Sequence, residues 1–192
     1  MLRAIIRVFD AFLCKLIGVH SFSEDIDCIL RIQLTEASRD ISFQEIKVNQ
    51  GDPILMYHLW NERLPVLPPE GPNLAWSVRL LHSFKKSFNL VAQYIQEKPN
   101  LLDIRALAGV TVLIPIDRGE GSTNLMERLG FTTIPYQSSL GYFGEFWENF
   151  YTWGLMWTYN PMSLRGRSLL NFKRKEYWMS IQTFLIRYGK TL

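Results

Sequence analysis

Cysteine is scarce in this chain of 192 residues, and the two present, Cys14 and Cys28, lie in different predicted elements without CxxC spacing. Structural zinc sites and small disulfide frameworks need several closely spaced cysteines, so neither is expected to hold this fold together. A chain without such cross-links is typical of a reducing compartment. We therefore expect a cytoplasmic location.

Long apolar runs are missing as well. None reaches the roughly 20 residues that a membrane-spanning helix needs, and the longest, residues 106–116, contains Pro115 and predicts a strand. The N-terminus superficially resembles a secretory signal, but Arg7, Asp10 and Lys15 interrupt its apolar stretch and no cleavage site follows. We expect this segment to be retained and the chain not to cross a bilayer.

The familiar catalytic signatures are also absent. The sequence has no GxSxG, HExxH or Walker motif and no cluster of metal ligands. It therefore contains none of the motifs that usually identify hydrolases, metalloproteases and nucleotide-binding enzymes. No metal site is predicted, and the residues leave any cofactor unidentified. Nucleic acid is not the expected partner, because the net charge is only +3 and the basic residues are interleaved with tryptophans and large aliphatic residues.

The chain is rich in apolar and aromatic residues. Hydrophobic residues make up 47% and aromatic residues 14% of it, whereas charged residues make up only 20%. A chain of this length and content buries one substantial core, so we predict a single domain over residues 1–192. Its expected parts are an amphipathic helix over residues 1–20, an α/β core over residues 24–136, and an aromatic, basic and helical part over residues 137–192.

The predicted core is organised around a strand at residues 54–60. Its sequence, ILMYHLW, is almost continuously apolar, which suits a strand buried on both faces. Hydrophobic periodicity predicts further strands at residues 28–34, 43–48, 110–116 and 131–134, and helices at residues 73–97, 123–129 and 173–188. This order predicts an α+β fold, with a mixed, mostly antiparallel sheet packed by helices and with amphipathic helices at both ends.

Two segments carry more apolar and basic surface than such a core requires. Residues 2–18 form a predicted amphipathic helix, which either docks on the core or lies at a membrane interface. Aromatic residues crowd residues 136–159, and residues 161–192 carry seven basic side chains against the single acidic Glu176. Aromatic residues beside Lys and Arg favour an anionic membrane surface. The alternative is that they form a second core or an oligomer interface.

The best polar cluster lies at the end of the central strand. His58 points into a layer beside Trp60, and the chain turns polar just after them. A histidine near a carboxylate can act as a general base, provided that the next long strand runs parallel and brings its own end to the same edge. The alternative is a core histidine with surface ion pairs around it. The candidate catalytic residues are His58 and Glu62, and the candidate ligand-binding residues are Trp60, Arg63, Asp117 and Arg118.

Residues 29–65 resemble the YkoP-like family of uncharacterised bacterial proteins, through the LRIQL strand, the Gly51-Asp52 turn and the HLWNERLP run. The helix that follows and the later LGF also fit, so the resemblance covers most of the chain. Members of that family occur alone or joined to polysaccharide deacetylase domains. The resemblance therefore implies a role in the metabolism of envelope carbohydrate or lipid, but it does not indicate which reaction, if any, the protein catalyses.

The predicted order of strand, long helix, strand, short helix and strand, with NLMERLGF at residues 124–131, also looks like the later half of the GNAT acyltransferases. Such enzymes bind the pyrophosphate of acyl-CoA on backbone N–H groups of a glycine-containing loop that opens the long helix. Here that loop reads RLPVLPPEGPNLA. It lacks the glycine pattern and has prolines in place of N–H donors, which puts the binding of CoA in doubt.

Two functions from different classes remain. The first is a membrane-peripheral accessory or binding protein of envelope lipid or polysaccharide metabolism, which lies on the inner face of a membrane and takes a small lipid, sugar or acyl ligand. The second is a GNAT-like acyltransferase that uses His58 or Glu62 as its general base. The proline-rich loop favours the first, because a phosphate cradle needs free N–H groups.

Overall fold

The computed structural model describes residues 2–101, 103–112, 125–138, 141–165, 172 and 174–189. Its α-helices are α1 (Leu2–Leu16), α2 (Leu74–Gln96), α3 (Leu125–Arg128), α4 (Gly141–Tyr159) and α5 (Ile181–Tyr188), with short 3₁₀ turns η1 (Pro99–Leu101) and η2 (Pro161–Leu164). Its strands are β1 (Leu30–Glu36), β2 (Ile41–Phe43), β3 (Ile46–Val48), β4 (Pro53–Leu59), β5 (Ala106–Thr111), β6 (Thr132–Pro135) and β7 (Lys175–Ser180). The predicted α+β class is confirmed.

The main sheet has five strands in the order β1-β4-β5-β7-β6. Strands β4 and β5 run parallel, while the other neighbouring pairs are antiparallel. The sheet is therefore mixed and mostly antiparallel, as predicted. Helix α2 connects the two parallel strands, because a parallel pair needs a long crossover connection.

The predicted central strand is correct. On β4, Leu55 and Tyr57 are buried in the larger core, while Met56 and His58 on the opposite face are half-buried. Helix α2 packs on the first face, and its Phe88 meets the ring of Tyr57 edge to face, with centroids 5.5 Å apart. The predicted cap is also present, since the side chain of Asn73 accepts a hydrogen bond from the backbone N–H of Trp76 at 2.9 Å.

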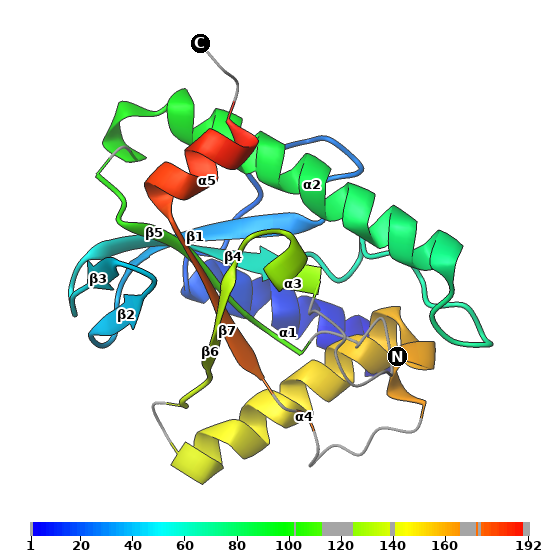
Figure 1. Ribbon diagram of the computed structural model, residues 1–192. Coiled ribbons are helices and arrows are strands. Elements are labelled where there is room, and N and C mark those ends of the chain that lie inside the picture. The colour runs from blue at the N-terminus through cyan, green and yellow to red at the C-terminus, as the bar shows by residue number, and fades with distance from the viewer. Residues whose placement is uncertain are drawn as a thin grey trace.

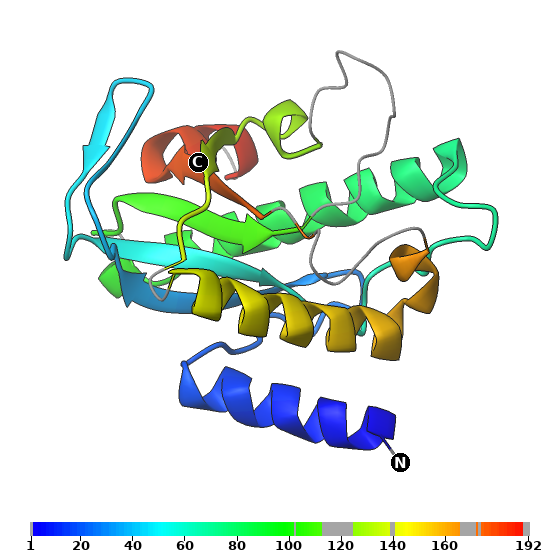
Figure 2. The same cartoon turned by 90° about the horizontal axis from the view of Figure 1, so that it is seen from below.

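Helices cover both faces of this sheet. Figure 2 shows α2 and α5 on one side, α4 on the other, and α1 as the outermost layer beyond α4. Figure 1 shows the separate β2–β3 hairpin at one end of the sheet, away from α4. The face that carries Met56 and His58 is thus covered by the hairpin at one end and faces α1 and α4 at the other.

Two predicted elements are wrong. Residues 43–48 are not one strand but parts of β2 and β3, which fold back on each other around Gln44, a residue with a positive φ of 53°. Residues 173–188 are not one helix, because 175–180 form β7 between β5 and β6. The side chain of Ser180 then accepts from the N–H of Thr183 and caps α5, which starts the helix later than predicted.

Gly109 provides a test of how closely β4 and β5 pack. A Cβ at this position would overlap the ring of Tyr57, which lies across the glycine. Overpacking a core of this kind costs about 1–3 kcal/mol, so we expect Gly109→Ala to lower the free energy of unfolding by that amount in urea titration. Gly154→Ala in α4 is the control, because its Cβ would lie 3.7 Å from Ile6 Cδ1, an ordinary contact. Equal stability of the two variants would contradict this account of the sheet.

Candidate functional site

The site lies where β4 and β5 end. Their pairing stops at Tyr57 and Gly109, and the strands themselves end at Leu59 and Thr111. The carboxyl ends of parallel strands are a common place for a ligand crevice, because both chains leave the sheet there. Two cavities meet at this edge, one on each side of the strand ends.

The first cavity, here called the polar cavity, has a volume of about 310 Å³. Its floor is the face of the main sheet, with Arg31 from β1 and His58 from β4, which are paired in register, and Arg174 just before β7. Its roof is formed by α1 and α4, which contribute Asp10 and Tyr151. Its volume lies at the lower end of the range for small-molecule sites.

The second cavity, here called the apolar cavity, has a volume of about 110 Å³. It lies between the first half of α2 and the second half of α4, and its described lining contains no ionised side chain. Six residues line both cavities, namely Leu59, Asn61, Thr111, Val112, Thr152 and Leu155. The two spaces are therefore neighbours, one polar and one apolar.

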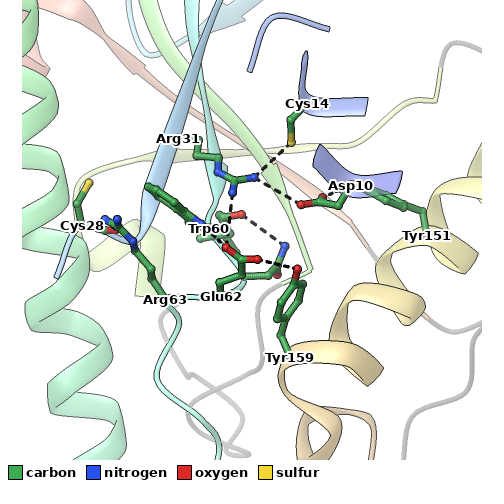
Figure 3. A network of polar contacts seen from close by, with 11 residues as sticks. Asp10, Cys14, Cys28, Arg31, Trp60, Glu62, Arg63, Tyr151 and Tyr159 are labelled. Atoms are coloured by element: carbon green, nitrogen blue, oxygen red, sulfur yellow. Dashed lines mark hydrogen bonds and ion pairs between the residues drawn. The ribbon is translucent and has the colours of Figure 1, made fainter. Parts of the chain in front are cut away.

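Arg31 is the centre of the polar network in Figure 3. Its Nη1 lies 3.5 Å from Asp10 Oδ2 and 3.4 Å from Cys14 Sγ, and its Nη2 lies 3.9 Å from Glu62 Oε2. The guanidinium also stacks over the ring of Trp60, with Cζ 4.5 Å from the centroid. A single side chain from β1 thus connects α1 to the chain that follows β4.

Asp10 is the one buried residue of α1. Its carboxylate accepts a hydrogen bond from the hydroxyl of Tyr151 on α4, in addition to its contact with Arg31. Burial, followed by this hydrogen bond, raises the pKa of Tyr151 above its ordinary value, so Tyr151 is a donor throughout the physiological range. The carboxylate therefore fixes α1 to both α4 and the sheet.

His58 lines the polar cavity, and its Nε2 lies 2.9 Å from Gln33 Oε1. Because that oxygen can only accept, Nδ1 is the ring atom left to take up a proton. Burial, and then the charge of Arg31, lower the pKa of His58 to about 4. The imidazole is therefore neutral near pH 7 and is a weak base.

Glu62 lies outside the lining of both cavities. Its carboxylate accepts from Trp60 Nε1 at 3.0 Å and from the hydroxyl of Tyr159 at 2.9 Å. The hydrogen bond from Trp60 is the main cause that lowers the pKa of Glu62. The structure brings Glu62 to the network around Arg31, and Glu62 is connected to His58 only through that network. The catalytic role of each residue stays a prediction.

The predicted ligand-binding residues lie in different places. Trp60 is stacked between Arg31 and Arg63, whose Cζ lies 3.6 Å from the ring centroid. Arg63 donates to the backbone oxygen of Asp25 at 2.6 Å, which turns its guanidinium away from the polar cavity. Asp117 and Arg118 lie outside the described residues.

The sequence analysis did not single out the most important residues of the polar cavity. They are Asp10, Arg31, Tyr151 and Arg174. The only available signal was Asp10, the one acidic residue in an otherwise apolar and basic helix. The other three come from segments far apart in the chain, and the spacing of residues in the sequence does not predict that these segments come together.

Among the described residues, no group of three or more His, Cys, Asp or Glu side chains is placed to hold a metal ion. No helix in that part of the chain is long and apolar enough to cross a membrane.

Comparison with known proteins points to a family. The family model described as the YkoP domain matches residues 1–188 of this chain. No curated protein and no solved structure matches it. The matched range includes α1, α4 and both cavities, so the family model covers the whole site. The predicted likeness to GNAT acyltransferases stays a prediction.

The pKa of His58 predicts how stability changes with pH. Its folded value of about 4 lies below the ordinary value of 6.5, so below pH 6.5 the unfolded chain takes up a proton that the folded chain does not. We therefore expect stability to fall by about 2 kcal/mol between pH 7 and pH 5 from this residue alone. His58→Gln should remove that part of the pH dependence in urea titrations, whereas His82→Gln at an exposed position should not. An unchanged pH profile in His58→Gln would contradict the burial described for this ring.

Proposed function

The chain belongs to the YkoP domain family, and we propose that it is a peripheral membrane protein with an accessory or binding role in envelope lipid or polysaccharide metabolism. It lies on the inner face of the membrane. The observation that carries the proposal is the orientation of α1, whose apolar face is turned away from the protein.

An amphipathic helix of a soluble domain normally buries its apolar stripe. In α1 the reverse holds, because Asp10 is 8% exposed while Phe12 is 59% and Leu16 is 68% exposed. Leu2, Ile5 and Phe9 are exposed as well. The helix is docked on the protein through Asp10 and Cys14, which contact Arg31 of the sheet, and much of its apolar surface stays exposed. An exposed apolar helix face of this size is typical of an interfacial anchor.

Helix α4 adds aromatic side chains beside α1. The two helices pack together where Phe9 meets Tyr151 edge to face and where Gly154 leaves room for Ile6. The first half of α4 exposes a stripe made of Tyr142, Phe143, Phe146, Trp147 and Phe150. We call this stripe and the apolar face of α1 together the membrane surface. Aromatic side chains of this kind concentrate at membrane interfaces.

The charges of α1 suit an anionic bilayer. Arg3, Arg7 and Lys15 are exposed, whereas the acidic Asp10 is buried. The guanidinium of Arg3 lies over Trp157 of α4, with Cζ 5.1 Å from the ring centroid. Each basic residue near an anionic surface contributes about 1 kcal/mol, and an apolar face plus basic residues supplies the two signals that stable attachment requires.

Vesicle flotation tests this proposal. We expect the full chain to float with vesicles that contain phosphatidylglycerol, and to float less with purely zwitterionic vesicles. The double change Ile5→Ser and Phe12→Ser should lower the partition coefficient at least tenfold, because each apolar side chain withdrawn from water contributes about 1.5–3 kcal/mol.

The matched control is Ile186→Ser, which changes an equally apolar residue, 86% exposed, on α5. It should float like the unchanged chain. Equal recovery on both kinds of vesicle would remove the electrostatic contribution, and absence of flotation would refute membrane binding. A concentration-dependent dimer that the double change abolishes, without flotation, would assign the surface to a second copy of the chain.

A GNAT-like acyltransferase is the second candidate, and one observation favours it. The ends of the parallel strands β4 and β5 border a cavity that contains His58, which is where an acyl group would react in such an enzyme. Against it stand the low pKa of His58, about 4, and the prolines at positions 65, 68, 69 and 72, which cannot donate N–H groups to a pyrophosphate.

Coenzyme A without an acyl group distinguishes the two candidates. We expect it to leave the melting temperature unchanged, because the loop before α2 offers few backbone donors to its phosphates. A thermal shift with coenzyme A that disappears in His58→Ala, but persists in His82→Ala, would favour the transferase over the binding protein.

A further inference from the structure

We propose that the polar and apolar cavities together bind one molecule of a single-chain anionic amphiphile. Its carboxylate or phosphate head lies between Arg31 and Arg174, and its alkyl chain lies in the apolar cavity. This inference rests on the proposed function only for the source of the ligand, which reaches the site from the bilayer beside α1.

The contacts of Arg31 indicate that an anion is the fitting head group. A good hydrogen bond from a guanidinium to a carboxylate is about 2.7–2.9 Å long. Arg31 instead reaches Asp10 at 3.5 Å and Glu62 at 3.9 Å, although its side chain is only 18% exposed. Its donors are thus turned toward acceptors that lie too far away for strong bonds. An oxyanion in the polar cavity would meet them at closer range.

Arg174 lines the same cavity from the same face of the sheet, in the segment just before β7. Its side chain donates to the neutral groups of Asn149 and Thr152, the second at 2.8 Å, and it lies 3.6 Å from Glu148. The carboxylate of Glu148 already accepts from Tyr136 at 2.9 Å. Burial lowers the pKa of Arg174, while the carboxylates of Glu148 and Glu145 act in the opposite direction.

The charge balance of the polar cavity also favours an anion. Its described lining holds two guanidinium groups and one carboxylate, that of Asp10, which is already hydrogen-bonded by Tyr151. The other acidic partners, Glu62 of Arg31 and Glu148 of Arg174, lie outside that lining. His58 between them is neutral, because its pKa is about 4. Two fixed cations in a cavity between the sheet and two helices attract a negative head more strongly than they would in water.

The apolar cavity fits a hydrocarbon chain. Leu64, Leu80 and Phe84 line one side of it, and Leu155 and Met156 of α4 line the other. Because the residues at the strand ends line both cavities, a chain that starts at the head group passes them directly into this space. A volume of about 110 Å³ holds a short stretch of one alkyl chain and is too small for two chains.

Isothermal titration of the full chain tests this inference with four probes below their micelle concentrations. We expect decyl phosphate and decanoate to bind at least tenfold more tightly than decanol, which lacks the charge, and than inorganic phosphate, which lacks the chain. A preference for decyl phosphate would assign lipid phosphates as the source of the ligand, and a preference for decanoate would assign free fatty acids. Either result supports binding of an anionic head group with one alkyl chain. Equal affinity for decanol, or no binding of any probe, would overturn the proposal.

Three variants locate the ligand. Arg174→Gln and Arg31→Gln should each weaken decyl phosphate at least tenfold, and Met156→Trp should do so by filling the apolar cavity. Arg105→Gln is the control, because it removes a guanidinium that is 65% exposed and lies outside both cavities. Circular dichroism checks that each variant is folded. Binding that survives in folded Arg174→Gln and Met156→Trp would refute this location.

His58 supplies a second readout. A bound anion beside the ring favours its protonated form, so its pKa should rise from about 4 when decyl phosphate is present. Proton NMR follows this titration with and without decyl phosphate. An unchanged His58 titration at saturating ligand would place the head group elsewhere and refute the inference.

Membrane binding and ligand binding can fail independently. The double change Ile5→Ser and Phe12→Ser alters only exposed side chains that do not line either cavity. If it abolishes flotation but leaves decyl phosphate binding intact, both proposals stand. If the unchanged chain floats without binding any amphiphile, this inference fails and the proposed function remains.

Discussion

The buried carboxylate of Asp10 is the constraint on which the arrangement of α1 depends. It accepts from Tyr151 on α4 and faces Arg31 on β1, so the helix is attached through its polar side. Breaking such a buried contact leaves an uncompensated charge, which costs far more than an exposed ion pair contributes. Because the polar side faces inward, the apolar side faces outward. One hydrogen-bonded carboxylate therefore fixes both the roof of the polar cavity and the exposed apolar side of α1.

The same arrangement places the exposed apolar side of α1 next to the polar cavity. Leu13 and Ile17 line the polar cavity, and they belong to the same segment as the exposed Phe12 and Leu16. A ligand that leaves a bilayer would therefore travel only across α1 to reach Arg31. This closeness gives a physical reason for an interfacial helix to be fixed on a ligand cavity, instead of hanging from a flexible linker.

The chemistry of the site agrees better with binding than with proton transfer. His58 is neutral and weakly basic, and both oxygens of Glu62 are engaged by Trp60 and Tyr159. A general base works best with a pKa near the working pH, and neither group is tuned in that direction. The guanidinium of Arg31, with its long contacts to Asp10 and Glu62, is instead suited to hold a charged partner in place.

The sequence by itself determined the α+β class, the central strand, the long capped helix and the amphipathic character of the N-terminus, because each depends on local periodicity and capping. It also placed His58 and Trp60 at the end of that strand. It did not determine that residues 175–180 form a strand, since their apolar pattern suits a helix equally well and only the gap between β5 and β6 makes them β7.

Tertiary structure alone decided which side of α1 faces the protein and which residues form the cavity. Asp10, Arg31, Tyr151 and Arg174 come from four segments far apart in the chain, and no spacing rule connects them. The free energy of burying a carboxylate depends on whether partners stand around it, and partners exist only once the sheet and α4 are assembled. That is why a helix that the sequence shows to be amphipathic is turned outward only by the folded protein.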